Sequence, residues 1–72
     1  MNKEEIALLQ KYLRDKFRLD TITLHARAQK DDSVEVHIGD EFIGIVFKDE
    51  EDGELSYQFQ MCILDLDLPG AA

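Results

Sequence analysis

The sequence predicts an α+β fold in which an N-terminal helix packs on one face of a four-stranded antiparallel meander sheet, giving two layers. Residues 3–17 carry apolar side chains at helical spacing, residues 21–38 alternate with a period of two, and glycine-containing turns separate the later segments. With 72 residues, the chain has room for one domain with a thin core. We expect a single domain over residues 1–68 and a disordered tail over residues 69–72.

The first expected element is a helix over residues 3–17. Asn2 is suited to cap its first turn, and Glu5, three residues later, completes a capping-box pattern. At 100° per residue, one side of this helix is apolar and the opposite side is basic. The apolar side holds Ile6, Leu9, Leu13 and Phe17, and the basic stripe holds Lys11, Arg14 and Arg18. We expect the apolar side to lie on the sheet.

Two alternating segments predict the first two strands. The KDDS segment at residues 30–33 predicts the turn between them. Alternate residues on each strand are apolar, so each strand should have one buried face. The apolar positions are Ile22, Leu24, Ala26 and Ala28 in the first strand and Val34, Val36 and Ile38 in the second.

The segment VEVHIGDEFIGIVF, residues 34–47, predicts a tight hairpin between the second and third strands. Gly39 and Asp40 suit a two-residue type II′ turn, because its first position needs a positive φ. This turn aligns the inward faces of the two strands. The expected pairs are Ile38 with Glu41, Val36 with Ile43, and Val34 with Ile45. Since the other phase, Phe42, Gly44 and Val46, is also without charge, we expect a central strand partly covered on both sides.

A second hairpin leads to the fourth strand. Glu51, Asp52 and Gly53 suit a three-residue loop with glycine at the left-handed position. The expected pairs are Phe47 with Tyr57, Ile45 with Phe59, and Ile43 with Met61. The inward side of this strand holds Leu55, Tyr57, Phe59, Met61 and Ile63, and the outward side holds Ser56, Gln58, Gln60 and Cys62. The apolar phase then shifts over residues 64–68, which is compatible with a bulge, a crossing to the other face or a short helical turn.

Charge is spread unevenly along the chain. Residues 1–30 carry a net charge of +3 and residues 31–72 carry −11, for an overall charge of −8 and a pI near 4.5. This balance argues against nucleic acid as a partner, because phosphate binding uses clustered Lys and Arg. No apolar run approaches the length of a membrane span, the N-terminus lacks a signal-peptide pattern, and Cys62 has no second cysteine to pair with. We therefore expect a cytoplasmic protein that does not enter membranes.

Few residues suggest chemistry. If Ala26 pairs with Val36, His25 lies opposite His37, and such a pair could bind a metal weakly. No further ligand or nucleophile is placed beside them by the pattern, so we predict no catalytic residue, cofactor or metal site. The acids of residues 49–54 lack the spacing of an EF-hand loop and are interpreted as a solvated hairpin tip. Cys62, in an apolar setting, is interpreted as an inert thiol.

The sheet face opposite the helix is the main candidate surface. In the expected register it shows Phe42, Val46 and Cys62, with His25, His37, Gln58 and Gln60 around them. An apolar patch with a polar rim on a small monomer often marks a contact site. The alternative is that the C-terminal LDLDL segment, residues 64–68, folds back and covers this face.

The span from KDDSVEVHIGDEFIGIVF through DEEDGELSYQFQM resembles a bacterial family of short acidic proteins known only as a domain of unknown function. The resemblance covers residues 4–68, and IGDEFIG and DGELSYQFQM are its most specific stretches. It implies a single-domain cytosolic protein and carries over no activity, ligand or catalytic residue.

The leading hypothesis is a non-enzymatic protein-interaction module that binds an unknown protein partner, or a second copy of itself, through the open sheet face. Its expected binding residues are Phe42, Val46, His37, His25 and Cys62. The alternative is a small-ligand or metal-binding protein with an enzymatic role that uses His25 and His37. A third reading, nucleic-acid binding through the basic stripe of the helix, depends on only three charges.

Overall fold

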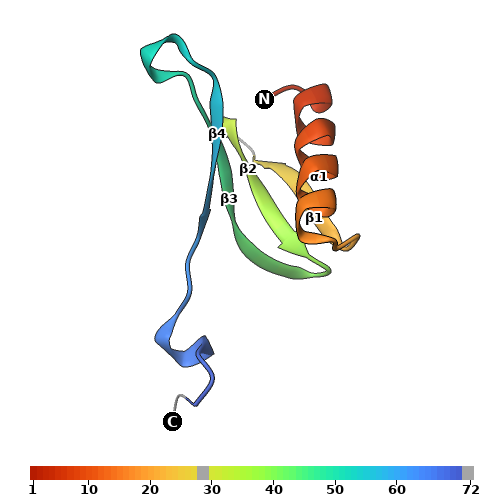
Figure 1. Cartoon of the computed structure of the whole chain (residues 1–72), viewed down its shortest axis with the longest axis vertical. Helices are drawn as coiled ribbons and strands as arrows, with labels where there is room; N and C mark the ends of the chain where they lie inside the picture. Colours follow the sequence, from red (N-terminus) through yellow and green to blue (C-terminus); the bar gives the residue numbers. More distant parts are fainter. Residues whose placement is uncertain (28–29, 71–72) are drawn as a thin grey trace.

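The computed structural model describes residues 1–27 and 30–70 of the chain. The four strands form one antiparallel sheet in the order β1-β2-β3-β4, with the helix on one face (Figure 1). The predicted helix and four-stranded meander are confirmed. The elements are α1 (Lys3–Phe17), β1 (Ile22–Arg27), β2 (Lys30–Ile38), β3 (Glu41–Asp49) and β4 (Ser56–Met61), with short 3-10 turns η1 (Glu51–Gly53) and η2 (Asp65–Asp67).

Both ends of α1 lie where the sequence places them. The backbone N–H of Glu5 donates to Asn2 Oδ1 (2.8 Å), and the backbone N–H of Asn2 donates to Glu5 Oε1 (3.2 Å), which completes the predicted capping box. The helix ends after Phe17, because Arg18 adopts the left-handed conformation with a φ of 54°.

The helix covers the β1 side of the sheet and leaves β4 apart from it (Figure 1). Two side chains of α1 bind the backbone of β1. Gln10 Oε1 accepts a hydrogen bond from the Leu24 N–H (3.0 Å), and Arg14 Nε donates to the Ile22 carbonyl (2.7 Å). Arg14 is therefore half-buried against the sheet, so its predicted place on a free basic stripe is wrong.

The core lies between α1 and the first three strands. Among the described residues, the buried apolar side chains are Leu13, Ile22, Leu24, Val34, Val36 and Val46. Ile6 and Leu9 pack against this core as predicted, whereas Phe17 is 54% exposed. Because α1 lies toward β1, Phe17 reaches only the edge of the Phe59 ring, with 6.4 Å between ring centroids. Ala26, also expected inside, is exposed.

The turn predicted over residues 30–33 is wrong, because β1 ends at Arg27 and β2 begins at Lys30. The side chain of Ser33 is buried in the sheet, and its hydroxyl accepts a hydrogen bond from Arg27 Nη1 (3.3 Å). Ala28, expected in the first strand, lies outside the described residues.

A connection this short moves the register of β1 and β2 by two residues from the predicted one. Leu24 pairs with Val36, where Ala26 was expected. As a result, His25 lies opposite Glu35 and not opposite His37. The inward faces of the two strands still coincide, because a shift of two residues preserves the side-chain phase.

The hairpin between β2 and β3 begins as predicted. Gly39 has a φ of 59°, Asp40 has no positive φ, and Ile38 pairs with Glu41, in agreement with a type II′ turn. A bulge at Ile43 then shifts the register. The observed pairs are His37 with Phe42, Val36 with Gly44, and Val34 with Val46, so the predicted pairing of Val36 with Ile43 and Val34 with Ile45 is wrong.

The bulge places glycine where β4 approaches most closely. A Cβ at Gly44 would overlap the backbone oxygen of Gln60 and would lie 2.8 Å from Cε1 of Phe59. Beyond the bulge, Val46 points into the core, and its neighbours Ile45 and Phe47 take the opposite face. The apolar run of β3 thus supplies both faces of the sheet.

Tyr57, Phe59 and Met61 share one side of β4 as predicted, but Phe59 and Met61 remain exposed there. The prediction that Leu55 and Ile63 also lie inward in this strand is wrong, because both lie outside β4 and are exposed. Each partner on β3 is shifted by one residue. The pairs are Lys48 with Tyr57, Val46 with Phe59, and Gly44 with Met61. Gly53 has the expected positive φ, at 76°. Pairing stops at Asp49 and Ser56, so the loop is longer than the three residues predicted.

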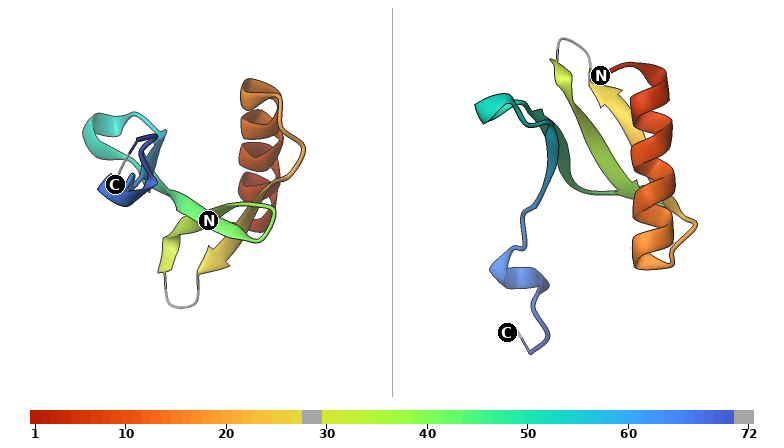
Figure 2. Two further views of the ribbon diagram at one scale, coloured as in Figure 1. Left: turned by 90° about the horizontal axis from the view of Figure 1, so that it is seen from below. Right: turned by 45° about the horizontal axis from the view of Figure 1, so that its top comes forward.

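After β4 the chain runs away from the sheet (Figures 1 and 2). Of the three alternatives for residues 64–68, the structure contains the short helical turn, η2. Leu66, in this turn, is 80% exposed, and the segment does not cover the sheet. Pro69 and Gly70 form a turn, and the rest of the expected tail, residues 71–72, lies outside the described residues. Among the described residues, no helix is both long and apolar enough to span a membrane.

Candidate functional site

The open face of the sheet, opposite α1, carries the predicted apolar patch with a different composition. Phe42 is 52% exposed, and Ile45 and Phe47 are half-buried beside it. Val46 is only 2% exposed and lies in the core, so its predicted place on the open face is wrong. The side chains of this open face include Thr23, His25, Glu35, His37, Phe42, Ile45, Phe47, Gln58 and Gln60.

The two histidines meet on the open face, although not as a directly opposed pair. His37 pairs with Thr23 in the register, but the rings of His25 and His37 are diagonal neighbours, with 4.5 Å between their centroids. His37 Nε2 lies 2.9 Å from Glu35 Oε1, and His25 Nε2 lies 3.0 Å from the hydroxyl of Thr23. The His37 ring also meets the ring of Phe42 edge-on, at 5.6 Å. The arrangement is a row of rings with hydrogen-bonded nitrogens.

Metal ligation would need more groups than this row provides. Within residues 1–27 and 30–70, no three His, Cys, Asp or Glu side chains are placed to hold a metal ion. The contact between His37 and Glu35 joins two candidate ligands, one fewer than a catalytic zinc site uses.

Cys62 is exposed. It lines a hollow of about 780 Å³ between the start of β3 and the C-terminal segment, and neither His25 nor His37 lines this hollow. Phe42 does line it. The structure therefore brings together Phe42 with His37 and Phe42 with Cys62, but it does not gather the five predicted residues at one point.

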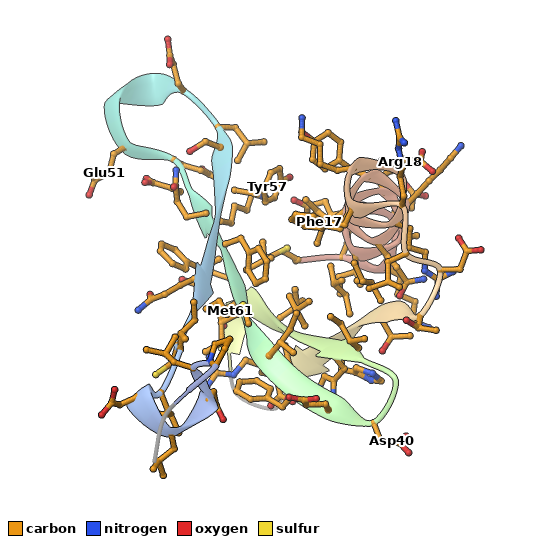
Figure 3. All side chains as sticks on the ribbon, turned by 60° about the horizontal axis from the view of Figure 1, so that its bottom comes forward. Phe17, Arg18, Asp40, Glu51, Tyr57 and Met61 are labelled. Atoms are coloured by element: carbon orange, nitrogen blue, oxygen red, sulfur yellow. The ribbon has the colours of Figure 1, made fainter. Side chains whose placement is uncertain are left out.

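A second apolar surface lies between α1 and β4. It is a groove of about 680 Å³, walled by Leu8, Tyr12 and Phe17 on the helix and by Tyr57 and Phe59 on the strand. Figure 3 shows Phe17 on the helix and Tyr57 on the strand, both on the sides where these two elements face each other. Sequence reasoning missed Leu8 and Tyr12, which flank the predicted apolar side of the helix. Their spacing of four residues was the available signal, because it places both on one stripe.

One end of this groove is closed by a charged cluster. Lys48 Nζ lies 2.9 Å from Glu5 Oε2, and the Tyr57 hydroxyl donates to the same oxygen (2.7 Å). The hydrogen bond from Lys48, followed by those from Tyr57 and the Asn2 N–H, lowers the pKa of Glu5 from 4.5 to about 2. The same carboxylate raises the pKa of Lys48 and the pKa of Tyr57.

The cluster ties the start of α1 to β3 and β4, where the helix has few other contacts. Sequence reasoning assigned Glu5 only to the capping box. The missed signal was Lys48, the single cation of residues 31–72, on a strand next to an inward-facing tyrosine. Because each charge is satisfied by a neighbour, we interpret the cluster as a structural clamp.

Comparison with known proteins identifies a family. The model of DUF3126, described as a protein of unknown function, matches residues 5–67, and the chain belongs to this family. The resemblance to a family of unknown function is confirmed. No curated protein and no solved structure matches the chain significantly.

Proposed function

We propose that this DUF3126 protein is a small non-enzymatic, cytoplasmic protein-interaction module whose binding surface is the open face of the sheet. The observation that carries the proposal is the exposed ring of Phe42, which stands beside half-buried Ile45 and Phe47 on a face that no described helix crosses. A contiguous apolar patch on a small protein is a common mark of a contact site.

The surroundings of Phe42 resemble the layout of a protein interface. Its ring packs edge-on against His37, which is itself hydrogen-bonded to Glu35 and is therefore held in place. Aromatic side chains that are fixed before binding lose little conformational entropy on contact, which suits them to act as anchors. The rim is polar, with His25, Gln58 and Gln60.

Charge indicates the chemistry of the partner. Residues 31–72, which form most of this face, carry a net charge of −11. Such a field favours encounter with a basic partner surface and slows encounter with an acidic one. We therefore expect the partner to present an apolar side chain within a basic surround.

Affinity capture from the native host tests the proposal. The chain and its Phe42→Asp variant are compared, with Leu8→Asp as the matched control because Leu8 is exposed on the opposite side of the molecule. We expect a specific protein to be captured by the wild type and the Leu8 variant and lost with Phe42→Asp. Capture that is identical for all three proteins, or absent for all three, contradicts the proposal.

The alternative is a small-ligand or metal-binding role, which could be enzymatic, for His25 and His37. The supporting observation is the distance of 4.5 Å between their ring centroids. Titration with zinc, followed by the NMR signals of the imidazoles, tests this alternative directly. Signals that do not move exclude it.

A further inference from the structure

The two edges of the sheet differ in how their backbone groups are satisfied. At β1, the outward N–H of Leu24 donates to Gln10 and the outward carbonyl of Ile22 accepts from Arg14, so side chains of α1 occupy this edge. At β4, no described strand or helix pairs with the outer side. An unpaired strand edge is a template for pairing with another chain.

The alternation of hydrogen bonds identifies the backbone groups exposed at the β4 edge. The backbone carbonyl of Ile22 and the backbone N–H of Leu24 point away from β2, so these two residues are not in hydrogen-bonded pairs with β2. Hydrogen-bonded and non-hydrogen-bonded pairs alternate along an antiparallel ladder, which fixes the hydrogen-bonded pairs of the whole sheet. Between β1 and β2 these pairs are Thr23 with His37 and His25 with Glu35. Between β2 and β3 they are Val34 with Val46 and Val36 with Gly44. Between β3 and β4 they are Ile45 with Gln60 and Phe47 with Gln58. The backbone N–H and carbonyl groups of Gln58 and Gln60 therefore point toward β3. Those of Tyr57, Phe59 and Met61 point outward, away from the sheet.

The sequence of this edge lacks the usual protection against pairing. Residues 55–64, LSYQFQMCIL, contain no charged residue and no proline, whereas β1, β2 and β3 each carry charged side chains. Natural proteins normally place lysine, proline or a bulge on an open edge to prevent contact between edges. The register irregularities of the described sheet lie between β1 and β2 and on β3, and none lies on β4.

The chain also exposes more surface than a compact protein of its mass. Its accessible surface is 5896 Å². A folded monomer of 8.3 kDa is expected to expose about 4,600 Å². The excess of roughly 1,300 Å² is shared between the β4 edge and the C-terminal segment, which runs away from the sheet. The radius of gyration, 13.6 Å, likewise exceeds the ~11 Å expected for this length.

We infer that β4 pairs with β4 of a second copy of this chain, antiparallel and centred on Phe59. The pattern of the edge is self-complementary about this residue, because apolar and polar positions alternate symmetrically on both sides of it. A two-fold axis at Phe59 makes every contact reciprocal, as a dimer requires. The apolar pairs are Leu55 with Ile63, Tyr57 with Met61, and Phe59 with Phe59 of the second copy.

Antiparallel pairing at one edge places both helices on the same side of an eight-stranded sheet. The grooves of the two copies then adjoin at the axis. Phe59 and Met61 are both exposed in one copy, and they face Phe59 and Tyr57 of the second copy. Two free edges become one ladder, which satisfies the outward backbone groups.

This inference concerns the β4 edge and does not depend on the proposed function, which uses the open face. The two open faces lie side by side in the dimer, so one dimer could present Phe42 twice. A variant at Phe42 tests the open face without changing the edge.

Sedimentation over a concentration series tests the dimer. We expect a species of twice the 8.3 kDa chain mass for the wild type. Met61→Pro removes an outward N–H at the end of an edge strand, where proline is tolerated. This variant should raise the dissociation constant at least about tenfold with the circular dichroism spectrum unchanged. Met61→Leu, which keeps the N–H, is the control and should remain dimeric.

A wild type that stays monomeric at the highest soluble concentration overturns the inference. A Met61→Pro variant that folds and dimerises as tightly as the wild type does the same.

Disulfide cross-linking tests the register in a Cys62→Ser background. Phe59→Cys puts two thiols in one cross-strand pair, with Cα atoms ~5.5 Å apart, a distance that a disulfide spans. Met61→Cys is the control, because its two thiols are offset by four residues, or roughly 13 Å. We expect fast disulfide formation for Phe59→Cys alone. Equal or faster cross-linking of Met61→Cys contradicts the register.

Discussion

The two halves of the chain contribute unequally to the core. Residues 1–38 supply Leu13, Ile22, Leu24, Val34 and Val36, whereas residues 39–72 supply Val46. Exposed large apolar side chains are more numerous in the second half. The large apolar residues exposed in the second half are Phe42, Leu55, Phe59, Met61, Ile63, Leu64, Leu66 and Leu68. The first half therefore forms most of the core, and the second half carries most of the exposed large apolar side chains.

The largest expected effect comes from matched leucine substitutions in the two halves. Leu13→Ala removes a buried side chain from under α1 and should lower the free energy of unfolding by about 3 kcal/mol. Leu66→Ala changes a side chain that is 80% exposed and should cost less than about 0.5 kcal/mol. Urea denaturation at one fixed protein concentration measures both. Similar costs for the two variants would show that the segment after β4 is covered within the single chain.

A smaller effect is expected at the junction of the halves, where β3 meets β4. Gly44→Ala places a Cβ against the backbone oxygen of Gln60, so the strands must separate, at a cost of about 2 kcal/mol. Gly53→Ala is the matched control in open space, where only its positive φ opposes the substitution, at a cost of about 1 kcal/mol. Thermal unfolding compares the two. A larger loss at Gly53 than at Gly44 would argue against the close approach.

The smallest effect depends on pH and concerns the clamp that joins the halves. The pKa of Glu5 is lower in the folded chain, about 2, than its ordinary value of 4.5. Ionised Glu5 therefore stabilises the fold above about pH 4.5, and this contribution is lost as the pH falls toward about 2.

We expect Glu5→Gln to be less stable than the wild type at neutral pH, with the difference disappearing near pH 2. Glu4→Gln, in the same turn, is the control and should change stability less. Urea midpoints across the pH range measure this. A difference that persists unchanged at low pH would show that the charge of Glu5 is not responsible.

The sequence was sufficient where the structure is locally determined. The capping box of Asn2 and Glu5 and the turn at Gly39 depend on residues within a few positions of one another, and both were predicted correctly. The phase of β4 was also predictable, because apolar and polar residues alternate there without interruption.

The sequence was insufficient where several arrangements bury similar side chains. From Phe42 to Phe47 every residue is apolar or glycine, so the pattern fits a bulged strand as well as a regular one. That ambiguity placed Val46 on the wrong face. The link between Glu5 and Tyr57 joins residues 52 positions apart and depends on where the helix crosses the sheet, which periodicity does not specify.

The hydrogen bonds from Gln10 and Arg14 to β1 have a consequence for solubility at high concentration. Growth of a fibril by strand addition needs two templating ends on every molecule, so that each newcomer offers a fresh site to the next. Here two outward backbone groups of β1 are already bonded from within the chain. If β4 pairs as inferred above, these bonds leave β1 a poorer second template, which favours a dimer over a growing row of strands.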